Sequence, residues 1–85
     1  MLTFDFKVRV PVGIHVRNAM LLSQTAAGYQ SDILVHKGER IANAKKLMDL
    51  MVLRVKCGEE IRFFIEGADE KDAFVGIMAL CEKNF

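Results

Sequence analysis

The stretch TFDFKVRVPVGIHVRNA, residues 3–19, changes its pattern midway, and that change decides the fold. In its first half apolar and polar residues alternate strictly, which predicts a half-buried β-strand over residues 3–10. The apolar positions of this strand are Phe4, Phe6, Val8 and Val10. Pro11 ends the strand because it has no backbone N–H to donate, and Gly13 accepts a positive φ. From Val16 onward apolar and small residues recur at helical spacing, so we expect a helix to begin there.

Five further elements follow this helix, which we expect to end at Gly28. Two of them form a predicted hairpin with its turn near Lys37 and Gly38, and Ile41 begins the return strand. A Leu- and Met-rich stretch without alternation predicts a short helix, an alternating stretch predicts a strand, and a final stretch predicts a helix with Asp69 as its N-cap. In chain order these stretches are DILVHKGER (32–40), KKLMDLMVLRV (45–55), EIRFFIEG (60–67) and ADEKDAFVGIMALCEKN (68–84).

The predicted order is therefore β-α-β-β-α-β-α. Strands that are polar on one face suit an antiparallel sheet whose other face is covered by helices. We expect an α+β fold of the open-faced sandwich type, with a four-stranded antiparallel sheet and three helices on one face. The 85 residues suffice for one domain, residues 1–85, with one modest core and no deep substrate cavity.

Composition and charge exclude several classes of function. The net charge is +1, so no overall field attracts nucleic acid, and aromatic residues do not interleave with basic ones. Cys57, Cys81 and the two histidines have no metal-ligand spacing, so we expect no metal and reduced thiols. No apolar run reaches the ~18 residues of a membrane span, and no signal-peptide pattern begins the chain. We expect a cytoplasmic protein.

The segment GIHVRNA, residues 13–19, places a histidine where the first helix begins. A helix N-terminus presents unpaired N–H groups and a partial positive charge, which together suit a phosphate group. His15 is a candidate nucleophile because a neutral imidazole is present near pH 7, and Arg17 adds a charged donor. A surface histidine beside a helix cap is the alternative interpretation of these two residues alone.

In this segment and four others, the sequence resembles the HPr family, the histidine phosphocarriers of the bacterial phosphotransferase system. The resemblance runs from the first strand to the last helix. It is carried by GIHVRNA (13–19), LLSQTAAGY (21–29), GERIANAKKLMDLM (38–51), CGEEI (57–61) and EGADEKDA (66–73). It implies a relay protein without a cofactor, rather than an enzyme that turns over a small substrate.

The resemblance also implies roles for individual residues. His15 matches the histidine that enzyme I phosphorylates on Nδ1 at the expense of phosphoenolpyruvate, and Arg17 matches the arginine that assists the transfer. Sugar-specific IIA proteins would then accept the phosphoryl group from a carrier that we expect to be monomeric. The implied phosphate-binding residues are Val16, Arg17 and Asn18, and the implied partner-binding residues are Met20, Gln24, Leu47, Met48 and Met51.

The Leu- and Met-rich helix supports an exposed docking surface independently of the resemblance. Leu47, Met48 and Met51 cannot all point inward together with Leu50 and Leu53, because one short helix has a single buried stripe. Some of them must lie at the surface, where adaptable methionine side chains suit several partners. The alternative is that all five belong to the core.

The site departs from the family pattern at two positions. Asn18 replaces the proline of the family motif, which restores a backbone donor and predicts a looser first helical turn. Val16 replaces a small residue, and its branched side chain is expected to crowd the imidazole.

The helix after the hairpin departs at three more positions. Lys46 stands where many relatives from Gram-positive bacteria carry a regulatory serine, so we do not expect phosphorylation there. Asp49 and Arg54 stand where relatives often have glycine. Arg54 either helps to bind the anion or marks drift away from former partners.

Two classes of function therefore compete. The first is a phosphocarrier that relays a phosphoryl group on His15. The second is an HPr-like regulatory or docking protein that no longer relays phosphate, which Val16, Asn18 and Lys46 favour and which the retained His15 and Arg17 oppose.

Overall fold

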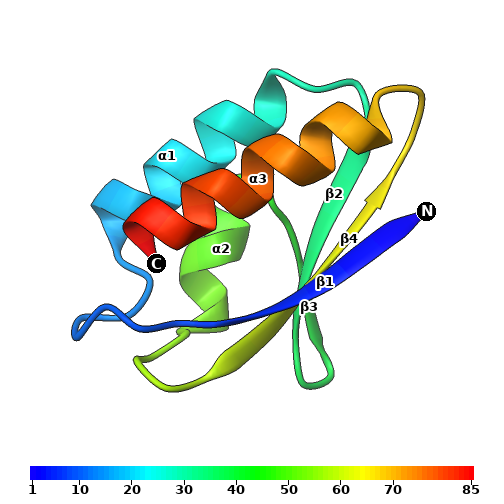
Figure 1. Ribbon diagram of the computed structural model, residues 1–85. Helices are drawn as coiled ribbons and strands as arrows, with labels where there is room; N and C mark the ends of the chain where they lie inside the picture. Colours follow the sequence, from blue (N-terminus) through cyan, green and yellow to red (C-terminus); the bar gives the residue numbers. More distant parts are fainter.

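The computed structural model describes residues 1–85 as a four-stranded antiparallel sheet with three helices on one face (Figure 1). The predicted fold class and the order of elements are confirmed. The elements are β1 (Leu2–Lys7), α1 (Val16–Ala27), β2 (Asp32–Lys37), β3 (Arg40–Asn43), α2 (Leu47–Leu53), β4 (Glu60–Glu66) and α3 (Glu70–Asn84). The strands lie in the order β1-β4-β2-β3, so β4, the last strand in the chain, lies inside the sheet.

The core forms between the helices and the inward face of the sheet. Alternation along β4, within the stretch predicted to be a strand, buries Ile61, Phe63 and Ile65 on one face. Phe63 stacks on Phe4 of the neighbouring strand, with ring centroids 4.8 Å apart. Each such buried side chain contributes about 1.5–3 kcal/mol relative to an exposed one, so this layer provides much of the stability.

The helices α1 and α3 lie side by side across the sheet, and the shorter α2 lies beyond them (Figure 1). Each long helix turns one stripe of buried side chains toward the core. The stripes consist of Ala19, Leu22, Ala26, Ala73, Ile77 and Cys81. The end of α3 thereby lies beside the beginning of α1, because the two helices run in opposite directions (Figure 1). No helix has the length and the apolar character needed to cross a bilayer.

The first strand is shorter than the sequence predicted. It ends at Lys7, which pairs with Glu60, the first residue of β4. Beyond that pair only Val8 still bonds to the segment before β4, through the carbonyl of Glu59 and the N–H of Gly58. The N–H groups of Arg9 and Val10 donate instead to the carbonyl of Phe85. The prediction of a strand to residue 10 is therefore wrong: alternation continues, but the hydrogen-bonding partner changes.

Asp69 holds the N-cap position of α3, as predicted, but its side chain does not cap that helix. Its carboxylate accepts hydrogen bonds from the N–H groups of Gln30 at 2.8 Å and Ser31 at 2.9 Å, and from the Ser31 hydroxyl. These bonds, the serine hydroxyl first, lower the pKa of Asp69. They join the loop after α1 to the beginning of α3.

Candidate functional site

The imidazole of His15 lies at the beginning of α1. His15 is the N-cap residue, with an extended backbone (φ −129°, ψ 177°), and its carbonyl accepts the first helical hydrogen bond from Ala19 at 2.9 Å. The residue as a whole is half-buried. The predicted position of the histidine at a helix start is therefore confirmed.

A close backbone contact holds the loop that precedes His15. Gly13 has a φ of +68°, and a Cβ at this position would lie 2.4 Å from the carbonyl oxygen of Val55. The next residue, Ile14, donates its N–H to the same carbonyl at 3.0 Å. Only glycine fits here, since any side chain would meet backbone atoms, and the contact places the loop against the chain that follows α2.

Asn18 braces this loop from inside. Its side chain is 4% exposed. The side-chain oxygen accepts the N–H of His15 at 2.9 Å, while the amide nitrogen donates to the carbonyls of Gly13 at 3.1 Å and Asn84 at 3.3 Å. The expectation that Asn18 loosens the first turn is wrong, because its side chain replaces the rigidity of a proline ring with three hydrogen bonds.

The outward side of the helix start carries the groups that suit an anion. The N–H groups of Val16 and Arg17 donate to no acceptor in the protein, because the helical ladder begins with Ala19. The side chain of Arg17 is exposed and makes no ion pair or hydrogen bond. The side chain of Asn18 is directed inward, so a phosphate at this end would meet backbone N–H groups and Arg17.

Exposed apolar side chains gather on α1 and α2. Met20 is 41% exposed and Met48 is 71% exposed, whereas Leu50 and Leu53 are buried. Leu47 and Met51 pack against the core while remaining partly exposed, and Gln24 is exposed one turn after Met20. The alternative that all the large residues of α2 are core is wrong. Of the predicted partner residues of α2, Met48 is thus exposed, and Leu47 and Met51 are partly exposed.

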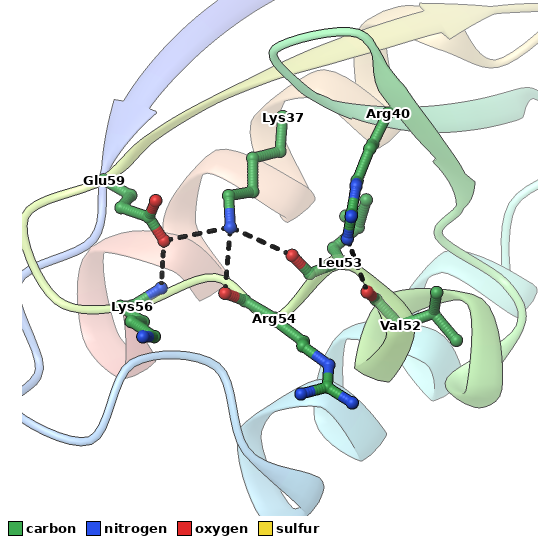
Figure 2. Close-up of polar contacts among 7 residues, drawn as sticks. All are labelled: Lys37, Arg40, Val52, Leu53, Arg54, Lys56 and Glu59. Carbon is green, nitrogen blue, oxygen red and sulfur yellow. Dashed lines mark hydrogen bonds and ion pairs between the residues drawn. The ribbon is translucent and has the colours of Figure 1, made fainter.

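Sequence reasoning missed the positively charged side chains that bind the carbonyl groups at the end of α2. The ammonium of Lys37 donates to the carbonyls of Leu53 and Arg54 and pairs with Glu59 at 3.1 Å (Figure 2). The N–H of Lys56 and then this ammonium lower the pKa of Glu59. Lysine at a helix C-terminus is a familiar signal, but Lys37 comes from the hairpin and not from the helix, so no local pattern predicts it.

Sequence reasoning also missed the inward role of Asn18. The capping-box pattern, in which the third helical residue bonds back to the N-cap N–H, was the signal that could have revealed it. The usual residue there is glutamate or glutamine, and the shorter asparagine concealed the pattern.

Fold and site together define the class: a small open-faced α+β domain that presents a histidine at the N-terminus of its first helix. A family model described as "PTS HPr component phosphorylation site" matches residues 2–83. The chain belongs to the HPr family.

The relatives of this chain have different names and roles within the family. Phosphocarrier protein HPr of Lysinibacillus sphaericus is 38% identical over 94% of this chain and 91% of its own. HPr-like protein Crh of Halalkalibacterium halodurans is 34% identical over 99% of this chain and 100% of its own. A phosphoryl donor subunit of a PEP-dependent dihydroxyacetone kinase, DhaM of Providencia stuartii, is 31% identical over 99% of this chain, which spans only 18% of that protein.

A crystal structure of HPr from Thermoanaerobacter tengcongensis is similar in fold, with a TM-score of 0.93 and 34% identity. The superposed region covers 98% of this chain and 93% of the Thermoanaerobacter chain. The backbone arrangement is thus that of the family, while two thirds of the side chains differ.

Proposed function

We propose that this protein is a cytoplasmic, monomeric phosphocarrier. The imidazole of His15 accepts a phosphoryl group from enzyme I of the phosphoenolpyruvate-dependent phosphotransferase system and passes it to sugar-specific IIA proteins. In the first step a bond forms between phosphorus and an imidazole nitrogen of His15 while the bond between phosphorus and the donor breaks. In the second step the bond between phosphorus and His15 breaks while phosphorus bonds to the acceptor. The protein is regenerated at the end of a relay cycle.

One arrangement carries this proposal. The half-buried His15 adjoins the unpaired N–H groups of Val16 and Arg17 and is followed by an unpaired guanidinium. These groups bind the doubly charged product without forming a covalent bond to it, and each hydrogen bond to a charged oxygen is about twice as strong as a neutral one. A stable but transferable phosphohistidine needs such an environment.

The exposed apolar residues give the carrier a surface to meet its donor and acceptors. Met20 and Met48 have flexible side chains, and they lie on α1, which begins directly after the histidine, and on α2, which packs against α1. Flexible methionine surfaces repack against different partners, which a relay protein requires. Gln24, Leu47 and Met51 complete the proposed docking surface.

The same surface supports a second candidate, an HPr-like docking protein that does not relay phosphate. The observation that favours it is the exposure of Val16, the residue that follows His15, which is 53% exposed and presents a branched side chain to any partner that approaches. This candidate predicts binding without a phosphohistidine.

The deciding experiment is intact-protein mass spectrometry after incubation with phosphoenolpyruvate and a purified bacterial enzyme I. We expect one phosphate adduct that is labile in acid, present in the wild type and in His36→Ala, and absent from His15→Ala. His36 is the matched control because it is the only other histidine of the chain. No adduct on the wild type, with an enzyme I that phosphorylates a known HPr under the same conditions, would refute the relay and favour the docking protein.

A further inference from the structure

Two of the five arginines lack partners within the protein, and both belong to segments around His15. The guanidinium groups of Arg9, Arg40 and Arg62 each donate to a protein oxygen. Those of Arg17 and Arg54 donate to none, and both side chains are exposed. We propose that Arg54 is a second phosphate-binding residue, which closes on the phosphoryl group of His15 from the side opposite Arg17. This inference rests on the proposed phosphocarrier function and names a residue for it.

The backbone contact between the two loops brings the segment of Arg54 to the loop before His15. Gly13 lies against Val55 and the Cα of Lys56, and Ile14 bonds to the carbonyl of Val55. Gly13 and Ile14 therefore both meet the peptide unit between Val55 and Lys56. His15 directly follows Ile14, and Arg54 directly precedes Val55, so the two residues flank the same backbone contact. The long arginine side chain therefore starts from the segment that packs against the loop before the imidazole.

The orientation of the side chain agrees with this arrangement. Figure 2 shows the guanidinium of Arg54 extending away from Lys37 and Glu59, on the side of the pale blue ribbon that leads into α1. No carboxylate pairs with it. An anion at the beginning of α1 is the partner that its charge and direction fit.

The backbone of Arg54 is strained, and the strain indicates that the side chain has a use. Arg54 has φ 52° and ψ 49°, and it is the only residue other than glycine with a positive φ. A left-handed backbone disfavours any residue with a Cβ, and glycine would adopt it freely. Strained residues of this kind cluster at functional sites, where the surrounding structure holds them in place.

The surrounding structure here is the set of cations around the end of α2. The Lys37 ammonium donates to the Arg54 carbonyl at 3.0 Å and to the Leu53 carbonyl at 3.1 Å, and Arg40 donates to the Val52 carbonyl at 3.5 Å (Figure 2). The Arg54 N–H donates to the carbonyl of Met51 at 3.3 Å. These bonds fix the backbone on both sides of the Arg54 Cα, so Lys37 acts as a positioning residue for the second guanidinium.

The test replaces Arg54 by glycine, which suits the left-handed backbone and so removes the guanidinium without harming the fold. The first readout is the dissociation constant of the complex between inorganic phosphate and the unphosphorylated protein. It is measured by NMR titration, from the chemical shifts of the Val16 and Arg17 N–H groups. We expect Arg54→Gly to weaken phosphate binding by about threefold to fivefold, the effect of one exposed charge pair. Its melting temperature should equal or exceed that of the wild type.

Lys71→Gln is the matched control, because it removes one exposed positive charge from the first turn of α3, at the end of that helix remote from His15. It should bind phosphate like the wild type. Arg54→Lys keeps the charge without the paired donors and should give an intermediate loss. Equal phosphate binding by the wild type and Arg54→Gly, or equal losses in Arg54→Gly and Lys71→Gln, would overturn the proposal.

A second readout separates this inference from the proposed function. With phosphoenolpyruvate, pyruvate and enzyme I at equilibrium, the ratio of phosphorylated to unphosphorylated protein should fall in Arg54→Gly by a similar factor. If enzyme I leaves the wild type unmodified, the relay is refuted, whereas the phosphate titration still decides the role of Arg54. Lys37→Met should weaken phosphate binding in the wild-type background and have no effect in the Arg54→Gly background, as expected of a residue that acts through Arg54.

Discussion

Replacing Asn18 by alanine should destabilise the protein strongly, although the residue adjoins a functional surface. Alanine leaves the buried carbonyl of Gly13 without its donor and the N–H of His15 without its acceptor. A buried polar group left unpaired costs about 1–3 kcal/mol, and the lost cap-type bond costs about 1 kcal/mol. The carbonyl of Asn84 is only part-buried, so water replaces its lost bond at little cost. The sum is about 2–4 kcal/mol.

The assay is urea denaturation followed by far-UV circular dichroism, with thermal melting as a second measurement. For a domain of this size each kcal/mol lowers Tm by about 4–8 °C, so the expected fall is roughly 8–32 °C. Gln30→Ala is the control, because it removes an exposed amide that makes no side-chain hydrogen bond. A loss below about 0.5 kcal/mol in Asn18→Ala, the range of ordinary surface substitutions, would refute the bracing role of this residue.

Three further predictions concern glycine geometry, thiol chemistry and acid stability. Alanine should cost far more unfolding free energy at Gly13 than at Gly38, since both have a positive φ but an added Cβ meets backbone only at Gly13; equal losses by urea denaturation would contradict this. Iodoacetamide should modify exposed Cys57 and spare Cys81 in the native protein, because burial raises the pKa of the Cys81 thiol to about 12; two adducts by mass spectrometry would be the contrary result. Hydrogen bonds, chiefly from the Ser31 hydroxyl, hold the pKa of Asp69 in the folded protein below the usual 3.8. The contribution of the Asp69 carboxylate to the free energy of unfolding is therefore fully present above pH 3.8 and is lost as the pH falls through the lower pKa of the folded state. The stability difference between wild type and Asp69→Asn should therefore shrink below that pH in acid denaturation, and a constant difference would count against it.

Local pattern was sufficient for the elements and their buried faces. The alternation around Phe63 and the helical spacing after Val16 placed these segments correctly, because each pattern repeats with the period of its own backbone. The excess of large apolar residues in α2 correctly required surface exposure, since a seven-residue helix has room for one buried stripe. These inferences depend only on residues that are near one another in the sequence, so the sequence alone was enough to make them.

Local pattern failed wherever a polar group has a distant partner. Alternation continues through Val10, but β1 ends at Lys7, and the N–H groups of Arg9 and Val10 donate to the carbonyl of Phe85. Lys37 binds carbonyls 16 and 17 residues away, and no periodicity reports such a bond. The side chain of Asn18 likewise points inward to a distant partner, the carbonyl of Asn84.

By itself, the sequence determined that a strand leads through a glycine loop to a helix that begins directly after His15, and that the whole chain forms a sheet and three helices. Only the tertiary structure decided what surrounds that histidine. The amide of Asn18 reaches the carbonyl of Asn84, 66 residues away, and the chain that follows Arg54 meets the loop before His15 through the carbonyl of Val55. The physical reason is that side-chain periodicity records which face is buried, whereas a hydrogen bond between distant segments exists only after the core has brought them together.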